Sequence, residues 1–186
     1  MTGGEMTGCE WIITPGLRDT VADLIRLYNH LKDKQGTKYP LMILGDRGVG
    51  KSLLIHIYKT LYEKDNPGKK IVRLNAAALT ETLVDSELFG HIKGAFTGAI
   101  KEKIGLVEEA NLLILEEIGE LPGFVQAKLL TFLEDGKYRM VGDNKERDAK
   151  KDLQIIVTTN KKKKDMRQDF YDRFRKFTVP LYTKDV

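Results

Sequence analysis

The sequence predicts an α/β domain in which a doubly wound, mostly parallel, five-stranded sheet carries helices on both faces. Short unbroken apolar runs, which strands buried on both faces require, alternate along the chain with segments of amphipathic helical spacing. A charged fraction of 31% beside 41% hydrophobic residues is ordinary for a globular protein, and 186 residues suffice for one domain with a substantial core. The composition therefore argues against the disordered and fibrous classes.

The first predicted helix begins near residue 14. We expect residues 1–13 to be a flexible lead-in and residues 14–186 to form the folded domain. Thr14-Pro15 indicates a helix start, because proline is favoured in the first turn. Six apolar residues then recur at helical spacing and predict one buried stripe: Leu17, Val21, Leu24, Ile25, Tyr28 and Leu31.

Five apolar runs are typical of strands: residues 41–44, 71–74, 112–115, 153–159 and 177–179. The run 112–115 is apolar throughout, so we expect it to lie centrally, with helices on both faces. Two more helices are predicted between the runs, one after residue 52 and one after Pro122, and Gly136 can end the second. Their apolar sides would be formed by Leu53, Leu54, Ile57, Tyr58 and Leu61 in the first, and by Val125, Leu129, Phe132 and Leu133 in the second.

The segment from Gly45 to Ser52 fits the pattern G-x-x-x-x-G-K-S and lies between a predicted strand and a predicted helix, as a phosphate-binding loop must. Its glycines let successive backbone N–H groups point at an anion, and the positive end of the helix dipole reinforces the attraction. Lys51 would reach the β- and γ-phosphates of ATP, and the Ser52 hydroxyl would ligate Mg2+. A glycine-rich turn with an incidental lysine is the alternative. The expected nucleotide-binding residues are Gly45, Asp46, Arg47, Gly48, Val49, Gly50, Lys51, Ser52 and Leu53.

An acidic pair, Glu116-Glu117, directly follows the run 112–115. Ligands of open α/β sheets gather at the carboxyl ends of strands, so both side chains should emerge beside the phosphate-binding loop. Glu116 can hold magnesium, and Glu117 can polarise a water for in-line attack on the γ-phosphate. Adjacent acids at a strand end are also common as solvated loop charges, but their combination with the loop favours the catalytic interpretation.

Residues 94–99 form a run of small residues with one aromatic side chain, Gly94-Ala95-Phe96-Thr97-Gly98-Ala99. Glycines at both ends would let such a loop project, and a phenylalanine at its tip is costly in water unless it meets a partner. The alternative is that Phe96 packs into the local core. With this GAFTGA motif, the sequence from residue 12 to the end resembles the central ATPase domain of bacterial enhancer-binding proteins, the sigma-54-dependent transcription activators among the AAA+ P-loop NTPases.

The resemblance implies a partner and an assembly. In this family the GAFTGA loop contacts sigma-54 and couples ATP hydrolysis to remodelling of the closed promoter complex of the sigma-54 RNA polymerase holoenzyme. It further implies ATP and Mg2+ as cofactors, a homo-oligomeric ring of six or seven subunits, and DNA contact through a domain outside this chain. The sequence ends without the family's helical lid, so we expect the chain to be part of a longer protein.

Four more residues match family positions. Asn75 is similar to the asparagine that restrains the catalytic glutamate, although it could simply cap the strand end. Asn160 matches the sensor asparagine aimed at the γ-phosphate, with a turn-forming role as the alternative. Arg167 and Arg173 resemble two arginines that enter the neighbouring subunit's active site, where a guanidinium stabilises the transferring phosphoryl group. Taken alone, the two arginines would be read as solvated surface residues.

The sequence also departs from the family pattern. Glu116 replaces the usual aspartate, and its extra methylene moves the first carboxylate relative to magnesium. The usual Gly-Gly-Thr before that strand is missing, and the segment from Asn160 to Arg167 is short and holds four lysines, residues 161–164. Such a lysine run could touch nucleic acid, but without interleaved aromatics it is more typical of a solvated loop.

Two functional hypotheses follow. The first is a ring-forming ATPase that drives sigma-54 RNA polymerase into the open complex; the second is a nucleotide-gated adaptor that binds a partner through the Phe96 loop and hydrolyses ATP weakly or not at all. Another AAA+ remodeller with a chance GAFTGA is a further alternative. We expect a cytoplasmic protein without membrane contact, because the sequence lacks a membrane-length apolar stretch and signal-peptide features and has a single cysteine, Cys9.

Overall fold

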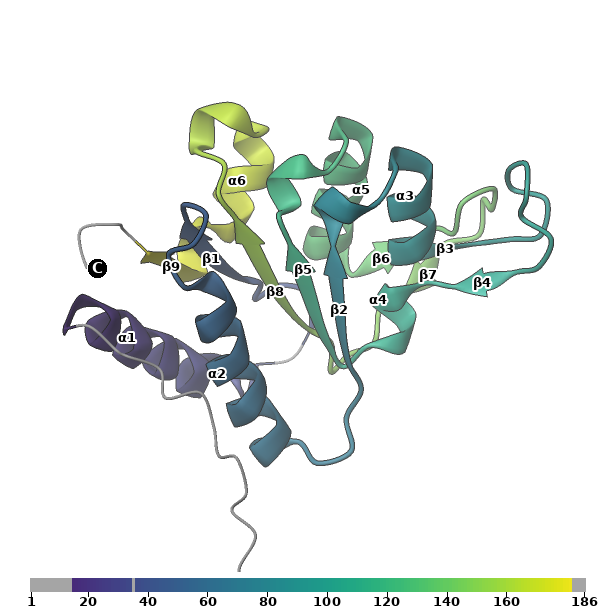
Figure 1. The fold of residues 1–186 in the computed structure, drawn as a ribbon. Coiled ribbons are helices and arrows are strands. Elements are labelled where there is room, and N and C mark those ends of the chain that lie inside the picture. Colours follow the sequence, from purple (N-terminus) through teal and green to yellow (C-terminus); the bar gives the residue numbers. More distant parts are fainter. Residues whose placement is uncertain (1–14, 35, 182–186) are drawn as a thin grey trace, which may run out of the picture.

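The structure is a computed structural model and describes residues 15–34 and 36–181. The expected lead-in, residues 1–13, lies outside the described residues. Within them the chain folds around one five-stranded sheet with helices on both sides (Figure 1).

All paired strands of the main sheet run parallel, as the sequence predicts. The spatial order is β2-β5-β8-β1-β9. Because neighbouring strands run in the same direction, crossover connections join them in place of tight hairpins. The strands are β1 (Leu41–Gly45), β2 (Ile71–Asn75), β5 (Leu112–Glu116), β8 (Gln154–Thr159) and β9 (Thr178–Leu181).

The run 112–115 lies inside the sheet with helices on both faces, as predicted, and the middle position itself belongs to its neighbour β8. That run forms β5, an interior strand beside β8, and its four apolar residues are at most 2% exposed. Both strands are covered on both faces, since five of the six residues of β8 are buried as well. This pattern cannot tell the middle strand from its interior neighbour, because both are covered in the same way.

Two separate core clusters lie on opposite faces of the sheet. Helices α1 (Pro15–Leu31) and α2 (Lys51–Asp65) cover one face of the sheet, and Leu112 and Ile114 of β5 point into the core cluster on that face. The alternate residues of β5, Leu113 and Leu115, face the other cluster, because successive side chains of a strand point to opposite faces. That second face is covered by α3 (Glu81–Phe89), α4 (Leu106–Glu109), α5 (Gly123–Asp135) and α6 (Gln168–Phe174).

The predicted apolar stripes are right for α5 and only partly right for α1 and α2. All four predicted α5 residues are fully buried, and Gly136 ends that helix with φ 71° while its N–H donates to the Phe132 carbonyl. On α1, Ile25 is 37% exposed. On α2, Ile55 and Tyr62 are buried in place of Ile57 and Leu61, which are only partly covered. Because α2 contacts both the sheet and α1, its buried stripe is wider than one side of the helix.

Two small antiparallel hairpins lie beside each other at the edge of the domain (Figure 1). One is β3 (Gly90–His91) with β4 (Lys103–Ile104), and the other is β6 (Lys137–Tyr138) with β7 (Arg147–Asp148). The Val141 N–H donates to the Gly90 carbonyl (2.8 Å), and the Ile92 N–H donates to the Val141 carbonyl (3.2 Å). These bonds join the two hairpins.

Short 3₁₀ turns complete the described chain: η1 (Ala76–Ala78), η2 (Ile118–Glu120), η3 (Lys163–Asp165) and η4 (Arg175–Phe177). Through residues 15–34 and 36–181, none of the helices combines the length and the apolar character that crossing a bilayer would demand.

Candidate functional site

The phosphate-binding loop joins the end of β1 to the start of α2. Gly48 and Gly50 adopt φ values of 81° and 102°, a backbone region that other residues rarely enter. A Cβ atom at either position would meet no heavy atom within 4 Å, so both glycines border open space. The positively polarised end of α2, a helix of 15 residues, begins directly after them. This geometry forms a cradle that can receive an anion.

Lys51 holds its ammonium group over this cradle. Its Nζ donates to the carbonyls of Gly45 (2.8 Å) and Asp46 (3.0 Å) and lies 3.4 Å from Glu117 Oε1. Only 10% of the Lys51 side chain and 22% of the Glu117 side chain are exposed, so solvent screens the pair less than a surface ion pair. A phosphate oxygen is the same kind of acceptor as those that surround Lys51 here.

Glu117 has an unusual backbone at the junction of three elements. Its φ of 53° is the one positive value outside glycine in the described part of the chain. Its N–H donates to Thr158 Oγ1 (3.3 Å), and its Oε2 accepts from the Asn160 N–H (3.2 Å). A left-handed residue costs about 1–3 kcal/mol and persists where its surroundings impose it. Thr158 was missed by sequence reasoning, although a hydroxyl in a buried strand is a usable signal because buried polar groups need partners.

Glu116, the predicted metal ligand, is paired with Arg73 of β2. Arg73 Nη2 donates to Glu116 Oε2 (2.6 Å) and Arg73 Nε donates to Oε1, which gives a bidentate ion pair. The hydrogen bond that Arg73 donates to Glu116 raises the pKa of the Arg73 guanidinium. Sequence reasoning also missed Arg73. It lies opposite Ile114, and Asn75 lies opposite Glu116, so Arg73 and Glu116 are diagonal neighbours on one face of the sheet.

The two predicted asparagines contribute in different ways. Asn75 Oδ1 accepts from the Ala77 N–H (3.0 Å) and caps η1, the arrangement expected of an asparagine at a strand end. Asn160 binds Glu117 through its backbone N–H, and its Oδ1 is buried without a hydrogen-bond partner among the described residues. Asn160 lines a cavity of about 320 Å³ beside the cradle. The other lining residues are Leu44, Gly45, Asp46, Lys162, Lys163 and Leu181.

The two predicted arginines face different surroundings. Arg173 Nη2 donates to the carbonyls of Leu133 (2.6 Å) and Lys38 (3.4 Å), so its guanidinium is held within its own chain. Arg167 is exposed and forms an ion pair with Asp169 (2.6 Å). Of the two, Arg167 is therefore the more accessible to a neighbouring molecule.

The lysine run between Asn160 and Arg167 is partly paired within the chain. Lys161 lies 3.1 Å from Glu120, and Lys163 lies 3.5 Å from Asp172. These contacts tie the end of β8 to η2 and α6.

The GAFTGA loop connects β3 and β4 and extends away from the sheet at the right of Figure 1. The Gly94 N–H donates to the Ala99 carbonyl (2.8 Å), and the Ala99 N–H donates to the Phe96 carbonyl (2.9 Å), so residues 94–99 form a compact turn. Phe96 is half-buried, with its ring edge-on to His91 at 4.9 Å between centroids. Thr97 is exposed at the turn. The aromatic ring is thus neither free in solvent nor part of the main core.

His91 anchors this turn to the domain. Its Nε2 lies 3.0 Å from the Lys101 carbonyl, which can only accept, so Nε2 carries the proton. Its Nδ1 lies 2.6 Å from the Ser86 hydroxyl. The ring links α3, both sides of the loop and Phe96. No sequence pattern marked this contact set in advance.

A family model described as the sigma-54 interaction domain matches residues 18–180. The chain belongs to the sigma-54 interaction domain family. The match includes the phosphate-binding loop, the acidic pair and the GAFTGA loop, so these sites lie in the part of the chain that the family shares.

Curated relatives of this sigma-54 interaction domain are named as regulators. The Nif-specific regulatory protein of Azotobacter vinelandii is 36% identical over 164 residues, which cover 84% of this chain and 31% of that protein. The anaerobic nitric oxide reductase transcription regulator NorR of Aliivibrio fischeri is 41% identical over 152 residues, which cover 77% of this chain and 29% of that protein. The chain therefore spans just under a third of the length of these relatives.

Solved structures agree with the fold. NtrX from Brucella abortus superposes with a TM-score of 0.71 at 24% identity, covering 95% of this chain and 37% of that chain. Domain III of the replication initiation protein DnaA from Thermotoga maritima superposes with a TM-score of 0.60 at 18% identity, covering 92% of this chain and 64% of that chain. The fold of this chain is therefore shared with both structures.

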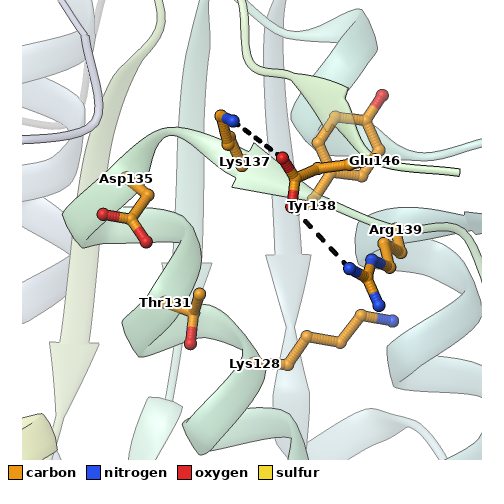
Figure 2. A pocket seen from close by; sticks show the side chains of 7 residues that line it. All are labelled: Lys128, Thr131, Asp135, Lys137, Tyr138, Arg139 and Glu146. Carbon is orange, nitrogen blue, oxygen red and sulfur yellow. Dashed lines mark hydrogen bonds and ion pairs between the residues drawn. The ribbon is translucent and has the colours of Figure 1, made fainter.

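A separate pocket of the sigma-54 interaction domain, about 230 Å³, lies between α5 and the β6–β7 hairpin (Figure 2). Its central carboxylate, Glu146, is 2.7 Å from Lys137 and 3.8 Å from Arg139. These exposed side chains already pair with one another, and the residues of the cradle are not part of this pocket. The cradle at the carboxyl ends of the strands is therefore the stronger candidate for the functional site.

Proposed function

We propose that the chain is an ATP-hydrolysing mechanochemical activator domain that contacts sigma-54 through residues 94–99 and remodels the RNA polymerase closed promoter complex. The observation that carries the proposal is the meeting of Lys51 and Glu117, 3.4 Å apart, over the open glycine cradle. Lys51, the expected phosphate-binding residue, comes from the start of α2, and Glu117, the candidate base, directly follows β5. Family membership and the NtrX structure in complex with ATP, TM-score 0.66, support ATP as the nucleotide.

Each residue has a role in this mechanism. The backbone N–H groups between Gly45 and Lys51 would bind phosphate oxygens, and Lys51 would exchange its carbonyl contacts for the β- and γ-phosphates. The phosphates would also compete with Glu117 for Lys51, which leaves the Glu117 carboxylate available to orient the attacking water and accept its proton. Asn160, whose N–H already binds Glu117, would report the state of the γ-phosphate to β8.

The oxygen donors at the site fit Mg2+. The Ser52 hydroxyl and the Glu116 carboxylate are the hard ligands that this ion prefers, and Mg2+ commonly takes one or two protein ligands besides phosphates and water. When bound, the ion would neutralise charge on the phosphate oxygens. Consistent with such a sparse set, the described residues contain no cluster of three or more His, Cys, Asp or Glu side chains suited to a metal.

Ring formation is part of the proposal. An arginine supplied by a neighbouring subunit is worth about three to five orders of magnitude in rate where it has been measured in other systems. The exposure of Arg167 suits this role directly, whereas Arg173 would first have to leave the Leu133 carbonyl. We also propose, from the family, a cytoplasmic protein whose DNA contact is made by a domain outside this chain.

The second candidate function is a nucleotide-gated adaptor with little hydrolysis. It is favoured by the engagement of Glu116 with Arg73 and of Arg173 with its own chain, because both side chains would be withheld from catalysis. Nucleotide binding and the partner loop would still serve such an adaptor.

Steady-state ATPase activity measured against protein concentration separates the two functions. For the ring ATPase we expect the rate per subunit to rise steeply with concentration and Glu117→Gln to lower it by about 10²–10⁴-fold. Glu120→Gln is the matched control, because Glu120 is an exposed acid three residues further on that pairs with Lys161. A flat, near-zero rate with intact nucleotide binding would instead identify the adaptor.

A further inference from the structure

The bidentate pair between Arg73 and Glu116 lies at the position where the proposed function needs a metal ligand. Both carboxylate oxygens of Glu116 accept from the guanidinium. The Glu116 side chain is 15% exposed, so water has limited access to the carboxylate. A charge-assisted fork of this kind is among the strongest hydrogen-bonding arrangements in proteins.

A guanidinium at this place is a permanent positive charge. Arginine keeps its proton throughout the pH range of proteins, so Arg73 cannot become neutral when a metal ion approaches. Two cations on one carboxylate repel each other and divide its hydrogen-bonding and coordination capacity. The glutamate favours the arrangement, because it is one methylene longer than aspartate and extends farther from the end of β5.

Arg73 has room to move away from Glu116. It belongs to β2, the edge strand of the sheet, and its side chain is 54% exposed. It also lines a cavity of about 220 Å³ beside α2, whose other walls include Ser52, His56 and Lys59. The guanidinium can therefore withdraw without crossing the packed core.

We infer that Arg73 is a positioning residue that competes with the divalent metal for Glu116 and thereby weakens the metal affinity of the nucleotide-loaded domain. This inference rests on the proposed function, because it requires that Glu116 ligate the metal that accompanies the nucleotide. Arg73 holds the carboxylate in a fixed orientation, and the metal must overcome that ion pair to bind. The affinity of the nucleotide-loaded domain for the metal is then set in part by a residue outside the phosphate-binding loop and the acidic pair.

The test is a titration with Mn2+, a paramagnetic substitute for Mg2+, at saturating ADP, with free Mn2+ measured by electron paramagnetic resonance. Arg73→Gln should bind Mn2+ on the order of tenfold more tightly than the unmodified chain. Arg73→Lys keeps the charge and should stay within about threefold. Lys70→Gln is the matched control, because Lys70 precedes the same strand and pairs with Glu109 instead. Thermal melting of each variant verifies that it is folded.

Unchanged or weaker Mn2+ binding by Arg73→Gln would overturn the inference. An equal gain in Arg73→Lys or in Lys70→Gln would also overturn it, since the effect would then not come from this guanidinium charge. ADP binding without metal is measured first. If the unmodified chain fails to bind ADP at all, the proposed function fails, whereas intact ADP binding with unaltered Mn2+ affinity removes the competition alone.

Discussion

Gly142 connects the β6–β7 hairpin to the GAFTGA loop, and its replacement by alanine should disturb that loop selectively. Gly142 has a φ of 80°, and a Cβ atom there would lie 2.7 Å from Ala95 Cβ and 3.0 Å from Ala95 Cα. Gly136 is the matched control. Its φ is similar, 71°, but a Cβ at this position would meet only Thr37 Oγ1 at 3.6 Å, an ordinary contact.

The two substitutions share one energetic cost and differ in another. A residue other than glycine in left-handed backbone loses about 1–2 kcal/mol, so both variants should lose stability, with Tm lower by about 2–4 °C per kcal/mol in a domain of this size. Gly142→Ala adds a carbon pair far inside the optimal separation of about 3.5–4.0 Å. Relieving overpacking of this kind costs about 1–3 kcal/mol, either as further lost stability or as displacement of Ala95.

Hydrogen exchange measured by mass spectrometry on peptides covering residues 90–104 distinguishes these outcomes. The amides of Ile92 and Gly94 are protected by hydrogen bonds to Val141 and Ala99. In Gly142→Ala we expect them to exchange about tenfold faster, the factor that 1.4 kcal/mol of local destabilisation produces. Gly136→Ala should leave them unchanged. Equal protection of these amides in both variants would refute the proposed contact between the hairpin and the loop.

Two further predictions concern the partner loop and acid stability. Thr97→Ala should reduce capture of sigma-54 in the presence of a transition-state analogue by at least ~tenfold, while hydrolysis stays largely intact. Replacement of the exposed Thr131 by alanine should leave capture unchanged. Undiminished capture by Thr97→Ala would remove the activator hypothesis. The hydrogen bond from Lys69 lowers the pKa of Asp152, so the carboxylate stabilises the fold above its unfolded-state pKa and loses this effect as pH falls through the lower folded-state value. Asp152→Asn should therefore lower the free energy of unfolding by about 0.5–1 kcal/mol at pH 7 and progressively less between about pH 5 and pH 2, as measured by urea titration; a difference independent of pH would contradict this account.

Glu116 and Glu117 could be predicted from the sequence, but the residues that hold them in place could not. The acidic pair itself was recognisable, because it follows an apolar strand and accompanies a phosphate-binding loop. Its partners were not, since Thr158 and Arg73 are 41 and 43 positions away in the chain. Arg173 illustrates the same limit, because the family resemblance implies a trans-acting role while the fold brings the Leu133 carbonyl, 40 positions away, to its guanidinium.

The sequence by itself determined the five strands, the glycine cradle and the end of α5 at Gly136. These features depend on apolar periodicity and on backbone conformations that glycine favours, and both are properties of neighbouring residues. Only the tertiary structure decided that β8 lies in the middle of the sheet, that Arg73 reaches Glu116, and that His91 contacts Phe96. The contact between His91 and Phe96 depends on the compact turn of residues 94–99 and on the bonds of His91 to Ser86 and Lys101. The other two features follow from strand order, which local patterns leave open because a strand buried on both faces can occupy any interior position of a sheet.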